Sequence, residues 1–492
     1  MVESPADHDV LKIIVLPWVT SGHMIPMVDA ARLFAMHGAD VTIITTPANA
    51  LTFQKSVDRD FNSGRLIRTH TLKFPAAEVG VPEGVENFNN TSPEMTSKVY
   101  LGVSMLREPT QQLIEDLRPD CLITDMFYPW AVDVADKLGI PRLIFQGPGS
   151  FGLSAMHSIK QYEPFKSVTS DTETFPLPGL PHKVEMTRLQ IPKWVREPNG
   201  YTQLMGRVKD SERRSYGSLV NSFYDFEGPY EEHYRKATGQ RVWSIGPVSV
   251  WVNQDAADKV GRGQDLVAED QNSWLNWLNS KEKNSVLYVS FGSMAKFPSA
   301  QLLEIAHGLE ASGHSFIWVV RKVDGDDDVD VWLPDFEKKM KENNKGFIIR
   351  NWAPQLLILD HPAIGGLLNH SGWNSVLEGA TAGLPMITWP LYAEHFYNER
   401  LVLDVLKIGV PVGVKEWKNL HEVGELVRRD AIAKAIKLLM GSGEEAEVMR
   451  KKAKELGVGA KKGIQVGGSS HTNLIAVIDE LKSLKKSRIQ GV

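Results

Sequence analysis

Residues 364–378 combine a short apolar run, a turn that contains glycine and the start of a helix. The run Ile364–Leu368 is typical of a buried strand, and a helix is expected to open near Trp373. A helix start carries unpaired backbone N–H groups and the positive end of a macrodipole, so it suits phosphate or pyrophosphate. Gly372 lets such a ligand approach the backbone closely. Further donors come from the side chains of His370, Ser371, Asn374 and Ser375.

Two further residues suit the other parts of a nucleotide. Glu378 lies one helical turn after Asn374 and Ser375, on the same face. A carboxylate repels phosphate, so its natural partner is a vicinal diol such as that of a ribose. Trp352 offers a flat surface on which a base can stack. Together these residues predict a nucleotide laid along the crevice at the end of a strand.

A histidine and an aspartate follow two other apolar runs. His23 comes after Leu11–Leu16, in a loop that leads into a helix with Pro26 in its first turn, and Asp125 directly follows residues 121–124. In an open α/β sheet the carboxyl ends of the strands border the ligand crevice, so both side chains can face one site. The loop before the helix lacks G-x-G-x-x-G, which argues against a dinucleotide-dependent dehydrogenase.

Parallel sheets are expected to position both groups of residues. Leu11–Leu16, the following helix and the run Val41–Thr45 form a strand–helix–strand unit, which is the building block of such a sheet. A later series of apolar runs predicts a second parallel sheet, with strands at Val286–Ser290, Phe316–Val320, Phe347–Arg350, Ile364–Leu368 and Met386–Trp389. Ser293 follows the first of these strands, and a helix is expected from about residue 299 to 310. The fold class is therefore α/β.

Size and composition limit the class of protein. The 492 residues exceed one typical domain, and an apolar content of 42% supports substantial cores. A net charge of −5 gives no reason to expect nucleic acid or an anionic membrane as a partner. The single cysteine, Cys121, excludes an intrachain disulfide and fits a reducing compartment. No signal peptide is apparent and no apolar run approaches the roughly 20 residues that span a bilayer, so we expect a soluble cytoplasmic protein.

The segment Trp352–His395 resembles, nearly residue by residue, the signature box of plant secondary-product glycosyltransferases, the plant family 1 of UDP-dependent glycosyltransferases. The match rests on Trp352, the run Ala353–Gln355, the run His370–Ser375, Glu378 and the pair Glu394–His395. The resemblance covers the whole chain, whose first half looks most like the branch that glycosylates triterpenoid sapogenins and flavonoids. It implies the GT-B fold, in which two Rossmann-like parallel-sheet domains face a central cleft.

The resemblance also implies roles for residues. It makes His23 the general base that removes a proton from an acceptor hydroxyl and Asp125 the partner of His23; an unperturbed histidine pKa of about 6.5 suits that task. A single displacement would invert the anomeric centre. The UDP-sugar is a co-substrate, and we expect neither a metal nor another cofactor, with the D-x-D of Asp324–Asp330 as a solvated surface loop. Implied donor-binding residues are Ser293, Trp352, Ala353, Gln355, His370, Gly372, Trp373, Asn374, Ser375, Glu378, Tyr392, Glu394 and His395.

Donor sugar and acceptor stay open. His395 stands where the family usually has glutamine, associated with glucose; histidine there has been associated with galactose, so the two sugars are nearly even, with glucuronate behind them. Pro148 stands where relatives often have a threonine near the sugar. Candidates for a lipophilic acceptor pocket are Phe127, Phe151, Met186, Trp194 and Met205. The alternatives from other classes are a non-catalytic UDP-sugar binder and an epimerase, which would need a nicotinamide cofactor.

A polar stretch after residue 250 predicts a linker. We expect an N-terminal acceptor-binding domain over residues 1–250, a linker over 251–272 and a UDP-sugar-binding domain over 273–470. The resemblance implies that residues 471–492 form a helix that packs back on the first domain. The expected partners are small molecules, and the protein is expected to be a monomer.

Overall fold

The computed structural model of the chain describes residues 10–89, 91–263, 271–321, 327–350, 352–419, 422 and 424–490. The D-x-D segment Asp324–Asp326 lies outside the described residues, as do residues 264–270 of the expected linker. The described part of the chain groups into two compact units. The first unit comprises residues 1–150, 199–265 and 462–492, and the second comprises residues 151–198 and 266–461.

This grouping differs from the expected boundary at residue 250. Residues 151–198 leave the first unit, and the chain then returns to it at residue 199. The first-unit segment at the end of the chain starts at residue 462, before the expected residue 471. The grouping is based on contacts in space, which a composition shift along the chain does not reveal.

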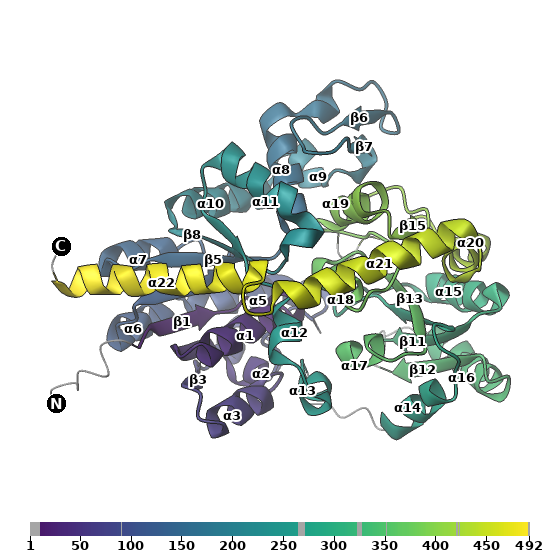
Figure 1. The fold of residues 1–492 in the computed structure, drawn as a ribbon, viewed down its shortest axis with the longest axis horizontal. Coiled ribbons are helices and arrows are strands. Elements are labelled where there is room, and N and C mark those ends of the chain that lie inside the picture. The colour runs from purple at the N-terminus through teal and green to yellow at the C-terminus, as the bar shows by residue number, and fades with distance from the viewer. Residues whose placement is uncertain are drawn as a thin grey trace. The chain divides into compact units, whose positions relative to one another are not determined.

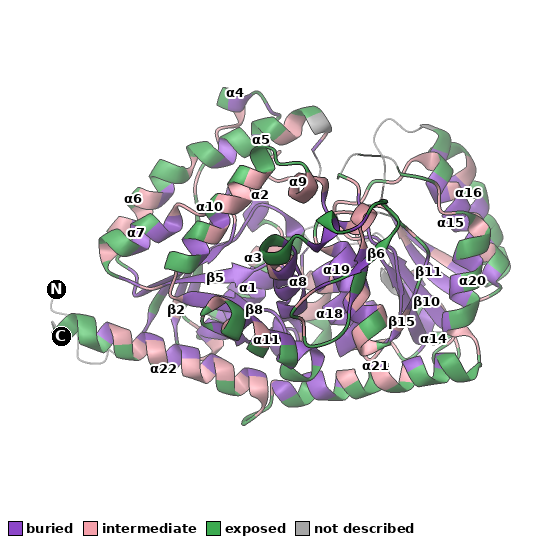
Figure 2. Ribbon diagram, turned by 90° about the horizontal axis from the view of Figure 1, so that it is seen from above, coloured by how far each residue is buried: buried purple, intermediate pink, exposed green. Residues whose placement is uncertain are grey.

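The first unit is built on a parallel sheet with the strand order β3-β2-β1-β4-β5-β8-β9 (Figure 1). Its strands are β1 (Lys12–Leu16), β2 (Asp40–Thr45), β3 (Ile67–Thr71), β4 (Cys121–Asp125), β5 (Arg142–Gln146), β8 (Gly217–Val220) and β9 (Val242–Ser244). Most strand residues are buried because helices cover the sheet (Figure 2). The strand order reverses between β1 and β4, and open α/β sheets bind ligands at the carboxyl ends of such a pair.

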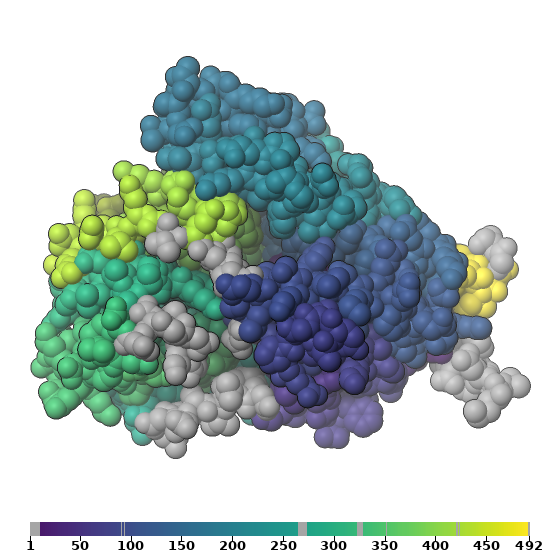
Figure 3. Space-filling model, turned by 180° about the vertical axis from the view of Figure 1, so that it is seen from behind, coloured from purple at the N-terminus to yellow at the C-terminus, as the bar shows by residue number. Residues whose placement is uncertain are grey.

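Helices complete the first unit. The longer ones are α1 (Ser21–Met36), α3 (Gln54–Asn62), α5 (Pro93–Met105), α6 (Arg107–Leu117), α7 (Ala131–Leu138), α10 (Gly200–Arg214), α11 (Tyr224–Thr238) and α22 (Ser469–Gln490). The last of these packs against β9, and ion pairs from its Lys485 and Arg488 to Asp120 attach it beside β4. Its final turn is exposed at the surface (Figure 3).

The second unit has its own parallel sheet, with the strand order β12-β11-β10-β13-β14-β15. Its strands are β10 (Val286–Ser290), β11 (Ser315–Val320), β12 (Gly346–Arg350), β13 (Ile364–Asn369), β14 (Met386–Thr388) and β15 (Gly409–Pro411). The strands predicted from the five apolar runs are all present. Here the order reverses between β10 and β13, so the carboxyl ends of these two strands mark a second ligand-binding edge.

Helices also pack in the second unit, beside a short antiparallel ribbon of β6 (Thr174–Pro176) and β7 (Glu185–Thr187). The main helices are α8 (Ser150–Tyr162), α14 (Gln271–Asn279), α15 (Ser299–Ser312), α16 (Asp327–Glu342), α18 (Trp373–Thr381), α19 (His395–Arg400), α20 (Arg429–Met440) and α21 (Glu444–Gly463). The helix expected over residues 299–310 corresponds to α15. α15 packs against α20, and buried residues of both helices belong to the same apolar core as buried residues of β10 and β11.

One local expectation about the first unit was wrong. The segment before the first helix was expected to be a loop through His23, with Pro26 in the first helical turn. Instead α1 begins at Ser21, so His23 lies in its first turn and Pro26 lies further inside the helix. A proline near a helix start signals the first turn only by preference, and the start is set here by Thr20, whose backbone is extended.

Candidate functional site

In the first unit, the ends of β1 and β4 place a histidine against an aspartate. His23 follows β1 in the first turn of α1, and Asp125 is the last residue of the neighbouring strand β4. The Nδ1 atom of His23 lies 2.7 Å from Oδ2 of Asp125, whose side chain is 1% exposed. An ionised carboxylate can only accept, so Nδ1 carries the proton and donates it. The other ring nitrogen, Nε2, then keeps its lone pair and can act as a base.

The position of Asp125 is set by the turn that follows β4. Its Oδ1 accepts a hydrogen bond from the backbone N–H of Phe127 at 2.9 Å. The ring of Phe127 also lies beside the imidazole of His23, with 5.6 Å between ring centroids. Both carboxylate oxygens therefore have a fixed partner, and the histidine has an apolar wall on one side.

A glycine forms another wall of the histidine. A Cβ atom at Gly147 would lie 2.8 Å from Cε1 of His23 and 3.4 Å from its Nε2. Real Cβ atoms essentially never lie within 3.0 Å of such a neighbour, so the first of these two distances excludes a side chain unless the imidazole moves. Gly147 thus leaves the imidazole the room it needs beside Asp125.

Replacing Gly147 with alanine is expected to lower kcat by about 10–100-fold, because the added methyl group pushes the imidazole away from its position against Asp125. Steady-state kinetics with a saturating donor would measure the loss. Gly206→Ala is the matched control, since a Cβ at Gly206 in α10 meets no atom within 4 Å. Equal kcat values for the two variants would show that the imidazole does not depend on this contact.

In the second unit, α18 begins directly after the turn that ends β13. Asn369 closes the strand, and its side-chain oxygen accepts the backbone N–H of Ser371 at 2.6 Å. Ser371 has a φ of 60°, a left-handed conformation that its Asn369 bond helps to maintain. Gly372 then caps the helix, which starts at Trp373. The predicted strand–turn–helix is confirmed, and the first-turn amides of α18 point toward the carboxyl end of the sheet.

His370 occupies the space between two glycines at this helix start. A Cβ at Gly372 would lie 2.4 Å from Nε2 of His370, and one at Gly292 would lie 2.5 Å from Cε1. Gly292 also has a φ of 75°, which disfavours any side chain there. Burial lowers the pKa of His370, the nearby Arg321 guanidinium contributes a smaller decrease, and together they bring it to about 4. The imidazole is therefore neutral at physiological pH, and its buried Nδ1 has no hydrogen-bond partner among the described residues.

The low pKa of His370 predicts loss of stability in mild acid. Below about pH 6.5 the unfolded chain binds a proton at this histidine, whereas the folded protein does not until about pH 4. Acid therefore favours the unfolded state by about 1–2 kcal/mol at pH 5. The thermal midpoint should fall less between pH 7 and pH 5 in His370→Gln than in wild type. The variant of the exposed His182, His182→Gln, should keep the wild-type difference, and equal differences in all three proteins would contradict the prediction.

Glu378 and Gln355 form a hydrogen-bonded pair beside α18. Nε2 of Gln355 donates to Oε2 of Glu378 at 2.7 Å, and the hydroxyl of Tyr288 donates to Oε1 of Gln355 at 3.3 Å. The amide thus orients the carboxylate that was predicted to bind a ribose. Trp352 is partly buried, and its buried Nε1 has no hydrogen-bond partner among the described residues. Ala353 is buried beside it.

Arg321 was not among the predicted site residues. It follows β11, and its Nη1 donates to the backbone oxygen of Ser293 at 2.6 Å. Within the described part of the chain it forms no ion pair with a carboxylate, and its charge acts on His370 and on Tyr392. A cation beside a helix start suits a diphosphate. The signal in the sequence was an arginine directly after an apolar strand, which is a weak signal without the sheet order.

The segment 391–395 places another histidine next to His370. The imidazole of His395 lies 4.9 Å from that of His370 and 4.6 Å from the ring of Tyr392, centroid to centroid. Its Nδ1 accepts the backbone N–H groups of Leu391 and Tyr392, both at 3.4 Å. Nε2 therefore carries the proton and is the donor that His395 offers a ligand. Glu394 is the residue before α19, and Asn398 of that helix donates to its Oε1 at 3.5 Å.

The predicted acceptor residues do not form one cluster. Phe127 and Met205 of the first unit pack in the same apolar cluster, together with Met126 and Ile144. Phe151 and Met186 belong to the second unit and are buried like core residues, 0% and 1% exposed. Trp194, in the short helix α9 (Lys193–Arg196) of that unit, is partly buried. Among these candidates for the acceptor pocket, Phe127 contacts His23. The role of each candidate in acceptor binding stays a prediction.

The arrangement of the described residues also bears on metal binding and on membrane insertion. Among them, no group of three or more His, Cys, Asp or Glu side chains is arranged to hold a metal ion. In the same ranges, no helix has the length and apolar character needed to cross a bilayer.

Comparison with known proteins connects this geometry to a family. Residues 242–415 match the family described as UDP-glucoronosyl and UDP-glucosyl transferase. The chain is 58% identical to a soyasapogenol B glucuronide galactosyltransferase of Glycine max, over 97% of each chain, and 48% identical to a UDP-glucosyl transferase of Saponaria officinalis, also over 97% of each. Among solved structures, a Glycyrrhiza uralensis protein, UGT73P12, complexed with glycyrrhetinic acid 3-O-monoglucuronide, is 56% identical, with a TM-score of 0.95 and 98% of both chains covered.

Proposed function

We propose an activity for this chain, which belongs to the family of UDP-glucuronosyl and UDP-glucosyl transferases. It moves a hexose from UDP-glucose or UDP-galactose to a hydroxyl of a lipophilic plant metabolite. The acceptor is a triterpenoid sapogenin or saponin, and a flavonoid is the alternative. The observation that carries the mechanism is the contact of 2.7 Å between Nδ1 of His23 and the buried carboxylate of Asp125. That contact leaves Nε2 of His23 as a base.

The acceptor half-reaction follows from this pair. Alcohols are poor nucleophiles near neutral pH because they are protonated. Nε2 of His23 takes the hydroxyl proton while the acceptor oxygen attacks the anomeric carbon, and the carboxylate of Asp125 stabilises the imidazolium that forms. A single displacement inverts the anomeric centre, so an α-linked UDP-sugar gives a β-glycoside.

Departure of UDP is assisted by groups in the second unit. Negative charge develops on the diphosphate, and the start of α18, neutral His370, Ser293 and Arg321 supply donors or positive charge for it. Glu378, oriented by Gln355, accepts from the ribose hydroxyls, and Trp352 stacks on the base. The other matched residues of the box, Ala353, Gly372, Trp373, Asn374, Ser375, Tyr392, Glu394 and His395, line the diphosphate and sugar. The chemistry needs no metal or resident cofactor, and we propose a monomer that works in the cytoplasm.

The names of the relatives favour a particular acceptor class. The Glycine max relative is named for a soyasapogenol glucuronide, and the Glycyrrhiza uralensis structure holds a triterpenoid monoglucuronide. At 58% and 56% identity, these two proteins make a sapogenin glucuronide the first acceptor to test. Galactose is then the favoured sugar, which agrees with a histidine rather than a glutamine at position 395.

Competition between UDP-galactose, UDP-glucose and UDP-glucuronate, with sapogenin glucuronides, sapogenins and flavonoids as acceptors, tests the proposal. Mass spectrometry with sugar analysis should find a β-hexoside. His395→Gln should lower the ratio of kcat/KM for UDP-galactose to kcat/KM for UDP-glucose by about 5–10-fold. The reason is that Nε2–H of His395 donates one hydrogen bond to the sugar. His182→Gln, an exposed control, should keep the wild-type ratio.

Other outcomes favour the alternatives. Transfer of glucuronate alone would make the protein a glucuronosyltransferase on the same acceptors. Binding of UDP without turnover of any acceptor would favour a non-catalytic UDP-sugar binder.

A further inference from the structure

We propose that Arg142 is a positioning residue, which holds the turn after β4 so that Asp125 meets His23. The proposal rests on the proposed function, because it concerns the same base. Arg142 lies at the start of β5, 17 positions after Asp125, and outside every motif of the sequence. It pairs with Leu122 in the neighbouring strand β4.

The side chain of Arg142 is 1% exposed, and all three nitrogens of its guanidinium donate hydrogen bonds. Its Nε donates to Oγ1 of Thr124 at 2.9 Å. Its Nη2 donates to the backbone oxygens of Asp125 at 3.3 Å and Tyr128 at 3.1 Å. One guanidinium therefore holds the first and last residues of the turn at the end of β4.

The other arm of the fork is anchored in a helix. Nη1 of Arg142 donates to the hydroxyls of Ser211 at 3.2 Å and Ser215 at 3.1 Å, at the end of α10. Because the guanidinium is planar and rigid, these anchors fix the plane in which Nη2 meets the turn. A lysine cannot reproduce such a fork, although it keeps the charge.

Because Arg142 fixes the turn after β4, it also fixes the position of Asp125 against His23. The backbone N–H of Phe127, inside the turn, donates to Oδ1 of Asp125 at 2.9 Å, and Oδ2 meets His23. The hydroxyl of Tyr128 donates to the backbone oxygen of Pro17 at 3.2 Å, in the segment between β1 and α1. Displacement of the turn would therefore change the position of the Asp125 carboxylate relative to His23.

The positive charge of Arg142 also stabilises the buried carboxylate of Asp125. Asp125 is buried, and a buried carboxylate is costly without a cation nearby. The acidic groups whose charges act on Arg142 are Asp125 of β4, Glu212 of α10 and Asp133 of α7. Burial lowers the pKa of Arg142 to about 10, so the guanidinium stays charged at neutral pH.

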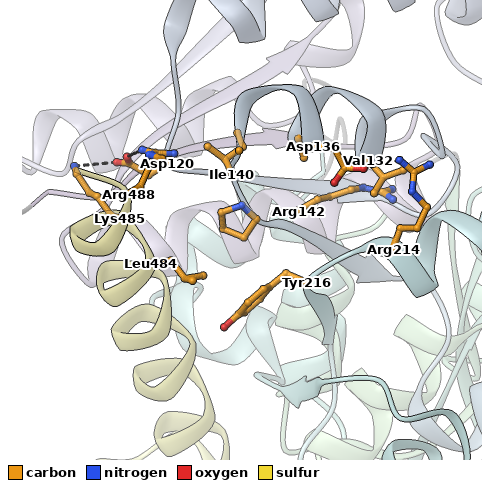
Figure 4. A pocket seen from close by; sticks show the side chains of 13 residues that line it. Asp120, Val132, Asp136, Ile140, Arg142, Arg214, Tyr216, Leu484, Lys485 and Arg488 are labelled. Atoms are coloured by element: carbon orange, nitrogen blue, oxygen red, sulfur yellow. Dashed lines mark hydrogen bonds and ion pairs between the residues drawn. The ribbon is translucent and has the colours of Figure 1, made fainter. Parts of the chain in front are cut away.

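A cavity of about 390 Å³ beside Arg142 makes a chemical test possible. Its walls come from α7, the start of β5, the end of α10 and α22, and Figure 4 shows Arg142 among Ile140, Arg214, Tyr216 and Leu484. Because Arg142 lines the cavity, shortening its side chain to alanine joins the space left by the guanidinium to the cavity. A small guanidinium ion can then reach Thr124 and the turn from this side.

The first experiment compares Arg142→Lys and Arg142→Ala with Arg214→Ala, which removes another cation that lines the cavity but bonds to Asp133 and Asp136 instead of the turn. We expect kcat to fall by about 10–100-fold in both Arg142 variants, with an unchanged calorimetric Kd for UDP. Millimolar methylguanidinium should restore part of kcat in Arg142→Ala and none in Arg142→Lys. Arg214→Ala should keep the wild-type kcat, and a wild-type kcat in Arg142→Lys would overturn the proposal.

The second experiment combines Arg142→Lys with Asp125→Asn. If Arg142 acts through Asp125, the double variant should be no slower than Asp125→Asn alone, whereas independent losses that multiply would overturn the proposal. Thr124→Val, which removes one anchor of the guanidinium, repeats this test with a milder change if Arg142→Lys does not fold. The proposed function fails separately, since that failure would appear as an inactive wild-type enzyme or an unchanged kcat in His23→Ala.

Discussion

Replacing His23 with alanine is expected to lower kcat by about 10²–10⁴-fold while UDP binds as tightly as before. Nδ1 of His23 is bound to the carboxylate of Asp125, so the base that takes the proton from the acceptor hydroxyl is the other ring nitrogen, Nε2. UDP affinity is expected to be independent of this change because the donor-binding residues belong to the second unit, whereas His23 belongs to the first.

Steady-state kinetics would measure kcat, and calorimetry would measure the Kd for UDP. His37→Ala is the matched control: His37 caps the other end of α1 and bonds to the backbone oxygen of Leu33. An unchanged kcat in His23→Ala would remove this histidine from the chemistry. Loss of UDP binding together with kcat would indicate a folding defect instead.

Replacing Asp125 with asparagine is expected to cost a comparable factor, about 10²–10⁴ in kcat. The asparagine amide can turn an N–H toward Nδ1 of His23, which then becomes the acceptor. The imidazole proton moves to Nε2, and the ring can no longer act as a base there. The variant also removes the negative charge that stabilises the imidazolium.

Kinetics of the double variant would separate this role from a structural one. Because His23 and Asp125 act as a unit, His23→Ala with Asp125→Asn should be no slower than the slower single variant. Asp133→Asn is the control, since Asp133 of α7 is 55% exposed and pairs with Arg214. Wild-type kcat in Asp125→Asn would show that the carboxylate does not set the tautomer.

Local sequence patterns were sufficient for the fold class and for the strand–turn–helix that contains the start of α18. Runs of apolar residues with short punctuated loops predicted parallel strands, because a strand buried on both faces has no polar face to show. The α/β fold class and the second sheet are confirmed by the strand orders. Family membership follows from relatives that match nearly the whole chain. The start of α18 after β13 is likewise a local feature, set by Asn369, Ser371 and Gly372.

Pairing between distant residues was predicted only as a possibility. His23 and Asp125 are 102 positions apart, and the sequence placed both at strand ends without giving the order of the strands. Because β1 and β4 are neighbours in the sheet, Nδ1 of His23 lies 2.7 Å from Oδ2 of Asp125. The same holds for Gln355 and Glu378, whose hydrogen bond depends on the packing of two helices.

The amino-acid sequence by itself determined which segments become strands and helices, and which polar side chains stand at their ends, because burial and helix-end hydrogen bonding act over a few residues. Tertiary structure alone decided that Gly147 leaves room for His23, that Arg321 follows a strand beside His370, and that Arg142 holds the turn of Asp125. These contacts join residues that lie in or after different strands, so they depend on strand order and register, which no single segment encodes.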